Sequence, residues 1–361
     1  MILKKGKKLD IVKILKEAVE KQAADIFIIT GMPVTFNISE RFEPLSDNKL
    51  KPEDTKNFIT EIYKIAGDRD IAPVFETGDD DFSISVPGLS RFRVNIYKQR
   101  SSFAAVIRII RFELPKPEQI GIPTSIMDLA DTKKGLVLVT GTAGSGKSTT
   151  LACIIDRINC TREDHIVTLE DPLEYLHKHN LSIISQREIS TDTISYVKAL
   201  RASLRQSPDV VLIGEMRDHE TISVAMSAAE TGHLVLSTLH TVGAANTIDR
   251  IIDAFSAGQQ NQIRIQLSMV LRAVVSQQLV PAVDKKMVPV FEIMFVNNAI
   301  RNMIRESKIH QIDTVIHSSV ADGMVTMDNS LINLYKKGII SDKTAVLYSS
   351  NQELMLKKLA L

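Results

Sequence analysis

The stretch GLVLVTGTAGSGKSTT, residues 135–150, constrains the fold of this chain more than any other part of its sequence. Gly141, Gly146, Lys147 and Ser148 fit the pattern G-x-x-x-x-G-K-[ST], directly after an apolar run and directly before a run of helical character. In this pattern the glycines let successive N–H groups face phosphate oxygens, and the amino end of the following helix adds partial positive charge. The stretch therefore predicts a nucleotide phosphate site.

Each position of this loop has an expected part in binding. Lys147 neutralises the β and γ phosphates, and the Ser148 hydroxyl can ligate magnesium. We therefore expect ATP and Mg²⁺ as cofactors. The residues expected to contact the nucleotide are Gly141, Thr142, Ala143, Gly144, Ser145, Gly146, Lys147, Ser148 and Thr149.

The order of strand-like and helix-like segments predicts two domains. The runs LVLVT, HIVTLE, DVVLIG and HLVLSTLH are separated by long helix-compatible segments, which is typical of a mostly parallel sheet covered by helices. Residues 11–23 have helical periodicity, and the short strands DIFIIT and DFSISV follow them, as in a small α+β unit. Three prolines in ELPKPEQIGIPT mark a boundary. We expect an α+β domain over residues 1–112, a linker over 113–124 and an α/β ATPase domain over 125–361.

Acidic residues follow two of the predicted strands. Glu215 follows the apolar run DVVLIG. The segment VTLEDPLEY carries Glu170, Asp171 and Glu174 at the end of another predicted strand. Because the carboxyl ends of parallel strands meet at one edge of a sheet, we expect these acids beside the phosphate loop. One of them can orient or deprotonate the attacking water, whereas an isolated acid at a strand end is more commonly a solvated loop charge.

Two histidines, His233 and His240, bracket the apolar strand LVLSTL. A single histidine there would be structural, but a pair bracketing a strand of this sheet is a candidate for sensing phosphate.

Composition excludes several classes of protein. With 44 basic and 43 acidic residues, 5% aromatic residues and no tryptophan, the chain has neither the net charge nor the aromatic-basic interleaving typical of nucleic-acid binding. No run approaches the roughly 20 apolar residues of a membrane helix, and no signal peptide is recognisable. Cys153 and Cys160 are too few for a four-cysteine zinc site. We expect a cytoplasmic protein with reduced, structural thiols.

The motifs GTAGSGKST, TLEDPLEY, VVLIGEMRD and AAETGHLVLSTLHT resemble, in order and spacing, the four nucleotide motifs of the secretion ATPase superfamily. Within it, DFSISVPGLSRFRVN, QLSMVLRAVVSQQL and AIRNMIRE (residues 299–306) are similar to the type IV pilus retraction ATPases, the PilT type. The resemblance implies a homohexamer of chains with a PAS-like amino-terminal domain and a RecA-like ATPase domain, working at the cytoplasmic face of the inner membrane. It also implies an inner-membrane pilus platform protein as partner, membrane association only through that partner, and no direct nucleic-acid contact.

The resemblance assigns roles to individual residues. It places Glu215 on the acid that organises magnesium and Glu174 on the catalytic base. His233 and His240 fall on the histidine box, and Arg93 and Arg108 on amino-terminal arginines that reach the nucleotide. One departure is Met287, which stands where relatives often have an arginine. If that arginine contacts nucleotide across subunits, either Lys285 or Lys286 substitutes for it or the contact is lost.

Three other functions remain open from the sequence. A pilus extension or type II secretion ATPase usually has a longer amino-terminal region and four zinc-binding cysteines, which this chain lacks. A conjugation-type DNA motor is disfavoured by the near-zero net charge, and a nucleotide-sensing scaffold by the presence of both acids.

The segment 299–312 predicts a helix with Ile300, Met303 and Ile304 on one face. That face either couples the motor to its partner or packs on its own domain.

Overall fold

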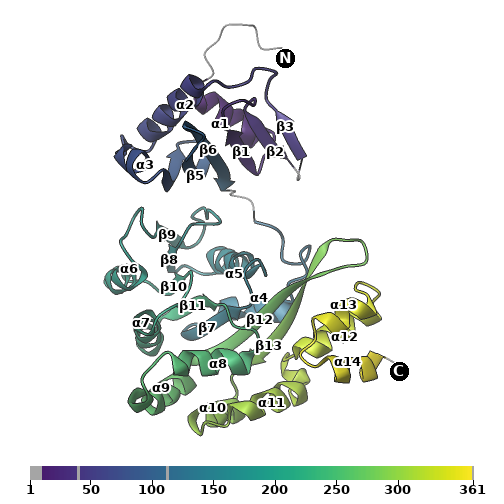
Figure 1. Cartoon of the computed structure of the whole chain (residues 1–361). Coiled ribbons are helices and arrows are strands. Elements are labelled where there is room, and N and C mark those ends of the chain that lie inside the picture. The colour runs from purple at the N-terminus through teal and green to yellow at the C-terminus, as the bar shows by residue number, and fades with distance from the viewer. Residues whose placement is uncertain (1–9, 39–40, 111–113, 360–361) are drawn as a thin grey trace. The chain divides into compact units, whose positions relative to one another are not determined.

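The computed structural model describes residues 10–38, 41–110 and 114–359. The chain forms two compact units, residues 1–112 and 113–361. Each unit is built on its own β-sheet (Figure 1). The predicted domain boundary at residues 112 and 113 lies outside the described residues.

The first unit is an α+β unit with a six-stranded antiparallel sheet in the order β3-β2-β1-β6-β5-β4. Helix α1 begins where the Asp10 carboxylate accepts a hydrogen bond from the Val12 N–H, and its buried side chains join one core with the sheet. The elements are β1 (Asp25–Ile28), β2 (Thr35–Ile38), β3 (Arg41–Pro44), β4 (Asp79–Val86), β5 (Ser90–Gln99), β6 (Ser102–Ile110), α1 (Ile11–Glu20), α2 (Pro52–Ile65) and α3 (Ala72–Glu76).

Strand β5 illustrates how the sequence divides this sheet into two faces. Phe92, Val94 and Ile96 are fully buried. The alternate residues are polar, because successive side chains of a strand point to opposite faces. The register sets Arg93 on β5 directly opposite Arg108 on β6, so both arginines lie on the polar face.

The second unit contains a seven-stranded sheet in the order β13-β12-β7-β11-β10-β8-β9. All neighbouring strands are parallel except β13, which pairs antiparallel with β12. The strands are β7 (Gly135–Thr140), β8 (His165–Glu170), β9 (Ile183–Glu188), β10 (Val210–Ile213), β11 (Leu234–Leu239), β12 (Leu271–Pro281) and β13 (Met287–Phe295).

Helices cover both faces of this sheet, which is why its central strands are apolar throughout. On β7, Leu138 faces the core formed with α7, α8 and α9, whereas Val139 faces the core formed with α4 and α5 (Figure 1). The helices are α4 (Thr124–Met127), α5 (Lys147–Thr161), α6 (Tyr196–Ser203), α7 (His219–Glu230), α8 (Ala244–Asp253), α9 (Ala257–Val270), α10 (Asn298–Arg305), α11 (Ile312–Ser318), α12 (Met327–Lys336), α13 (Asp342–Leu347) and α14 (Gln352–Leu359), with short 3₁₀ turns at Asp128–Asp131, Ile309–Gln311 and Val320–Asp322.

The segment predicted as a linker packs within the second unit. Ile122 is 6% exposed and belongs to the core beside α5. The Cys153 thiol lies 3.6 Å from the Pro115 carbonyl oxygen. The described part of this segment, from residue 114, is therefore packed against the second unit and is part of its structure. Cys153 is a buried free thiol.

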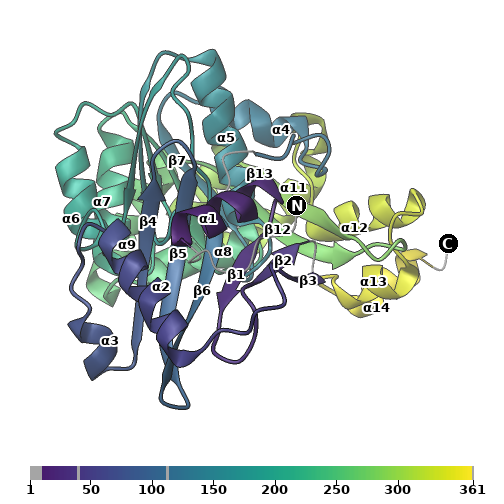
Figure 2. The same ribbon diagram turned by 90° about the horizontal axis from the view of Figure 1, so that it is seen from above.

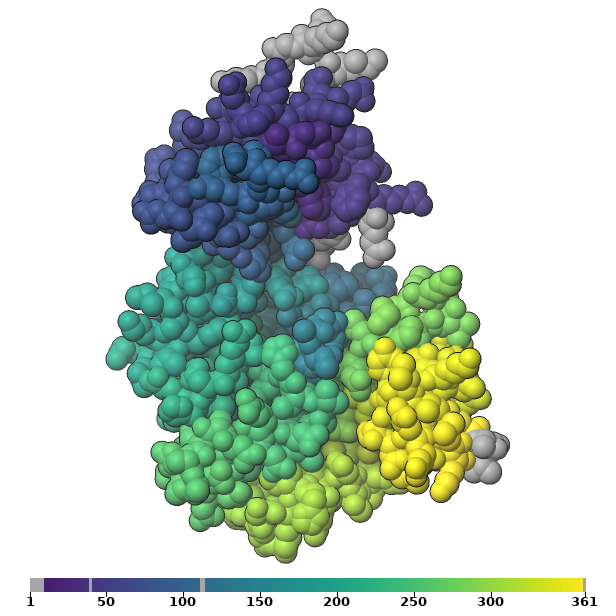
Figure 3. Space-filling model, in the orientation of Figure 1, coloured from purple at the N-terminus to yellow at the C-terminus, as the bar shows by residue number. Residues whose placement is uncertain are grey.

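The hairpin of β12 and β13 carries a small core of its own. Val280 and Val290 pack with Met327, Leu331 and other residues of α12–α14. Figure 2 shows these helices beside the hairpin, and in Figure 3 their yellow atoms form one continuous area. Met287 lies at the tip of the hairpin and is 54% exposed. Among the described helices, none is long and apolar enough to cross a membrane.

Candidate active site

The phosphate loop between β7 and α5 has a backbone that only glycine fits at two positions. Gly141 has φ +145°, and a Cβ there would lie 2.1 Å from the Gln277 carbonyl oxygen. Gly146 has φ +87° and caps α5; a Cβ there would lie 2.8 Å from the Gln277 side-chain nitrogen. The loop thus passes close to β12 and leaves α5 free to begin at Lys147.

Lys147 is 8% exposed, and its ammonium donates to the carbonyls of Gly141 (2.8 Å) and Thr142 (2.9 Å). Burial lowers the pKa of this lysine, while the charges of Glu215 and Glu174 act in the opposite direction. Both predicted acids therefore lie close enough to Lys147 to raise its pKa. All three residues follow the carboxyl ends of parallel strands, β7, β8 and β10, and so lie at one edge of the sheet.

The loop fits a nucleotide phosphate. The Ser145 hydroxyl is buried and has no hydrogen-bond partner among the described residues. Lys147, Ser148 and Thr149 begin α5, so their N–H groups lack the carbonyl partners that later residues of the helix have. No group of three His, Cys, Asp or Glu side chains in the described part of the chain could hold a metal alone. Magnesium in phosphate sites takes few protein ligands besides water and phosphate, and Ser148 and Glu215 have oxygen atoms of the kind that would hold it.

Glu215 follows the end of β10, and its carboxylate is 16% exposed. One oxygen accepts from Arg217 Nε at 2.7 Å, and the other lies 3.2 Å from His240 Nε2. His240 follows β11, whose end pairs with the end of β7 at Thr140. The structure therefore brings His240 and Glu215 together beside the phosphate loop.

His233 lies elsewhere. It precedes β11, where its carbonyl accepts from the Gly135 N–H at the start of β7, and its ring contacts the Ala228 carbonyl at 2.9 Å. The six residues of β11 separate the two histidines by about 20 Å. His240 therefore lies at the edge of the sheet that carries the phosphate loop, and His233 lies at the opposite edge, because residues at opposite ends of a strand lie at opposite edges of the sheet.

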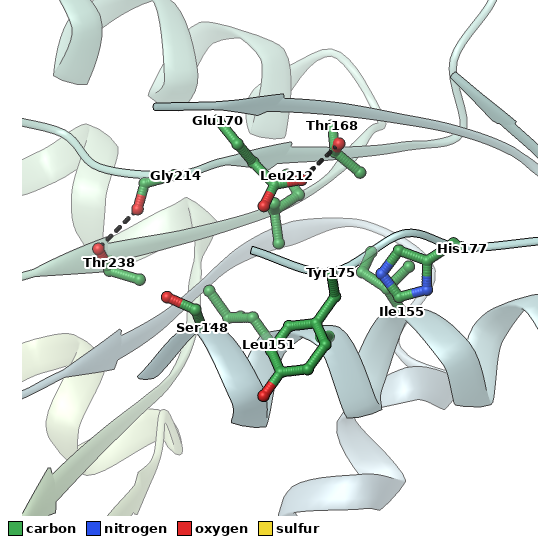
Figure 4. A pocket seen from close by; sticks show the side chains of 11 residues that line it. Ser148, Leu151, Ile155, Thr168, Glu170, Tyr175, His177, Leu212, Gly214 and Thr238 are labelled. Carbon is green, nitrogen blue, oxygen red and sulfur yellow. Dashed lines mark hydrogen bonds between the residues drawn. The ribbon is translucent and has the colours of Figure 1, made fainter. Parts of the chain in front are cut away.

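Glu174 is exposed and lies in an irregular segment after β8, which includes a cis peptide bond between Asp171 and Pro172. Glu170, at the end of β8, faces a small pocket between α5 and β10, shown in Figure 4. The pocket has a volume of about 30 Å³, enough for a water molecule. Ser148 and Tyr175 also line it. Burial raises the pKa of the Glu170 carboxyl to about 7.

Arg93 and Arg108 belong to the first unit, and the contacts described for them are with residues of that unit. Arg93 donates to Asp81 at 2.6 Å, and Arg108 donates to Asp25 at 2.9 Å. The Arg108 side chain is 68% exposed. Both guanidinium groups therefore lie on an open sheet face, each with a carboxylate partner.

No sequence motif pointed to Gln277, which is 3% exposed on β12. Its side-chain oxygen accepts from the Thr150 hydroxyl at 2.7 Å, across 127 residues of sequence. This bond ties β12 to the first turn of α5, so Gln277 supports the phosphate loop from behind. Only the folded chain shows such a long-range contact.

The AIRNMIRE segment forms α10, but its apolar face is not a free surface. Ile300 and Ile304 are fully buried in the core, and Met303 is half-buried. The helix ends at Arg305, and Ser307 has φ +60°, so the predicted continuous helix to residue 312 is wrong. The exposed positions of the segment are Ala299, Asn302, Arg305 and Glu306.

A phosphate loop after β7 of a mostly parallel sheet, with acids at the ends of β8 and β10 of the same sheet, defines a P-loop ATPase with a RecA-like domain. The family follows from comparison with known proteins. The model of the type II/IV secretion system protein family matches residues 6–338, and the chain belongs to this family. The predicted fold class and enzyme class are confirmed.

Relatives in this family include well-described motor proteins. The chain is 41% identical to the type IV pilus retraction ATPase PilT of Pseudomonas aeruginosa over 337 residues, covering 93% of this chain and 97% of the relative. It is 48% identical to the twitching motility protein of Neisseria gonorrhoeae over 276 residues, covering 76% and 74%. A crystal structure of the pilus retraction motor PilT with bound ADP matches with a TM-score of 0.88 at 43% identity, covering 97% of this chain and 99% of that chain.

Proposed function

We propose that this ATPase is a motor that powers type IV pilus retraction and twitching motility. The observation that carries the proposal is the convergence of Lys147, Glu174 and Glu215 at one sheet edge, in a chain that matches PilT over nearly its whole length. The predicted retraction function agrees with the names of these relatives.

The residues divide the work of hydrolysis between them. The phosphate loop, the first N–H groups of α5 and the Lys147 ammonium bind the phosphates, and the ammonium exchanges its carbonyl partners for phosphate oxygens. Ser148 and Glu215 would hold Mg²⁺, which would neutralise charge on the phosphates. Glu174 takes the proton of the attacking water.

His240 and the two arginines complete the site. His240 contacts the carboxylate of Glu215 and thereby senses the state of the phosphate end. Arg93 and Arg108 bring positive charge from the first unit when domains close around the nucleotide. Their carboxylate partners, Asp25 and Asp81, hold them until they engage.

The chain acts as an oligomeric ATPase, and we propose a homohexamer at the cytoplasmic face of the inner membrane. Its partner is the pilus platform protein, which mediates any membrane association, and it binds no nucleic acid directly. ATP hydrolysis then drives movement between domains, and this movement exerts force on the platform protein.

Gene deletion with complementation tests this function. Cells that lack the gene should carry pili that extend but do not retract, and the wild-type gene should restore twitching. Glu174→Gln should not restore it, while Glu163→Gln, which changes an exposed glutamate before β8, should. A deletion that removes the pili themselves would instead indicate an extension motor.

A further inference from the structure

Glu292 on β13 is a buried acid that the proposed chemistry does not use. Its side chain lies inside the second unit with 7% exposure. Burial raises the pKa of its carboxyl. A buried carboxyl costs free energy unless hydrogen-bond donors reach it, so the donors of Glu292 show what an acid does at this position.

The donors of Glu292 are the first N–H groups of two helices. Ala244 begins α8, and its N–H donates to one carboxylate oxygen at 2.8 Å. Met327 begins α12, and its N–H donates to the other oxygen at 3.3 Å. Such N–H groups have no carbonyl partner within their own helix, and negative charge is favourable beside them. One carboxylate thus holds the starts of α8 and α12 at the same point of β13.

The two helices differ in how much they depend on this carboxylate. Helix α12 follows Thr326, whose side chain accepts from the Asn329 N–H. Helix α8 follows Gly243, which has φ +90° and no side chain that could accept a hydrogen bond. Glu292 therefore supplies from β13 the cap that the sequence before α8 cannot supply.

The start of α8 is joined to the phosphate loop through hydroxyl groups. Residues 240–243, here called the histidine segment, connect β11 to α8 and begin with His240. The Thr241 hydroxyl lies 2.7 Å from the Thr247 hydroxyl in α8. Thr247 is fully buried, and its hydroxyl is also 3.5 Å from that of Thr140, the last residue of β7 before the loop. A displacement of the phosphate loop therefore reaches the first turns of α8.

Strand β12 makes a second connection between the same parts. The Ser276 hydroxyl accepts from the Gly243 N–H at 2.9 Å. Gln277, the next residue, accepts from the Thr150 hydroxyl in α5. The register places Ser276 directly opposite Glu292, so both side chains lie on the same face of the sheet, toward the start of α8. A nucleotide in the phosphate loop thus has two routes to the helix starts that Glu292 holds.

We propose that Glu292 is a positioning residue that couples the histidine segment to α12, so that nucleotide binding stabilises the start of α12 as well as that of α8. A carboxylate has two acceptor oxygens and serves both helix starts. An amide has one acceptor oxygen and would turn a donor toward the second N–H. Helices α12–α14 share one core with the β12–β13 hairpin, so a change in α12 affects all three. This inference rests on the proposed nucleotide site and gives Glu292 no catalytic role.

Amide hydrogen exchange in the full-length chain, with and without saturating ADP, tests the proposal. In the wild type, ADP should slow exchange by about fivefold or more at the starts of both α8 and α12. In Glu292→Gln, ADP should still slow exchange at α8 but should have no effect at α12. Ser330→Ala is the matched control, because it removes another bond from α12 to β13, at 2.6 Å to the Phe291 carbonyl, without touching α8. It should keep the ADP effect at both helices.

Three results would overturn the inference: no ADP effect at α12 in the wild type, an effect at α12 that survives in Glu292→Gln, or an effect lost equally in Ser330→Ala. Calorimetric titration shows whether ADP fills the site in each protein. A folded wild type that binds no ADP would overturn the proposed nucleotide site and this inference with it.

A second variant addresses the same bond from the other side, should Glu292→Gln not fold. Ala244→Pro removes the donor on α8 and leaves the carboxylate in place, since proline is tolerated at the first position of a helix. It should abolish the ADP effect at α12, and a persisting effect there would again contradict the proposal.

Discussion

Burial disfavours the charged form of two side chains near the phosphate loop. Lys147 has a lowered pKa and Glu170 a raised one, each because the surrounding protein disfavours its charge. Such groups cost folding stability and remain where binding or catalysis needs them. Replacing such a group is therefore expected to change the free energy of unfolding and the activity in opposite directions.

Glu170→Gln should become relatively more stable as pH rises. The pKa of Glu170 rises from 4.5 to about 7 in the folded chain, so the folded state binds the proton more tightly than the unfolded state. The wild type therefore loses stability as pH rises through this window, by up to about 1.4 kcal/mol per unit of pKa difference. Urea unfolding of both proteins at about pH 5 and about pH 8 measures it. A stability difference that stays constant between the two pH values would contradict the raised pKa.

Gln277→Glu should weaken nucleotide binding. The new side chain keeps an acceptor for the Thr150 hydroxyl but places negative charge beside Gly146, where phosphate binds. We expect ADP affinity to fall by about tenfold or more. Calorimetric titration with ADP measures this, and Gln278→Glu on the other face of β12 is the control. Equal affinities in the two variants would show that Gln277 does not approach the phosphates.

At the scale of elements, α10 combines a buried face with an exposed one. Ile300→Ala should destabilise the chain by about 2–5 kcal/mol, because it opens a cavity in the core.

Replacing Asn302 and Arg305 with alanine should leave stability and ATP turnover near normal and abolish twitching, if α10 couples the motor to its partner. Retained twitching in that double variant would show an ordinary surface helix.

Local patterns predicted the phosphate loop and the strands β7, β8, β10 and β11, because apolar runs and the phosphate-loop motif depend on neighbouring residues. The mostly parallel arrangement of these strands followed, and with it the edge at which Glu215 lies. The two histidines lie at opposite ends of β11. The support from Gln277 rests on a contact across 127 residues, which no local pattern contains. The burial of Ile300 was an alternative that periodicity alone could not decide.

At the scale of the whole molecule, the expected charges of the site come from both units. The phosphate loop lies in the second unit, and Arg93 and Arg108 lie in the first. The proposed roles of Arg93 and Arg108 in hydrolysis predict that activity depends on the full chain and on its assembly.

A fragment of residues 114–361 should therefore bind ATP but hydrolyse it poorly, whereas the full chain should gain specific activity with protein concentration as rings form. A fragment starting at residue 125 should be less stable, because it loses the buried Ile122. Steady-state phosphate release and thermal unfolding measure both effects. Full activity in the shorter or the longer fragment would mean that the first unit contributes nothing to the chemistry.

The most direct test of the account is phosphate release by Lys147→Ala, beside Lys133→Ala, which changes an exposed lysine just before β7. Lys147 begins α5, its ammonium lies within the phosphate loop, and the charges of Glu215 and Glu174 both raise its pKa. We predict that Lys147→Ala folds normally by circular dichroism and loses ATP turnover, while Lys133→Ala keeps it. Unchanged phosphate release by folded Lys147→Ala would contradict the account.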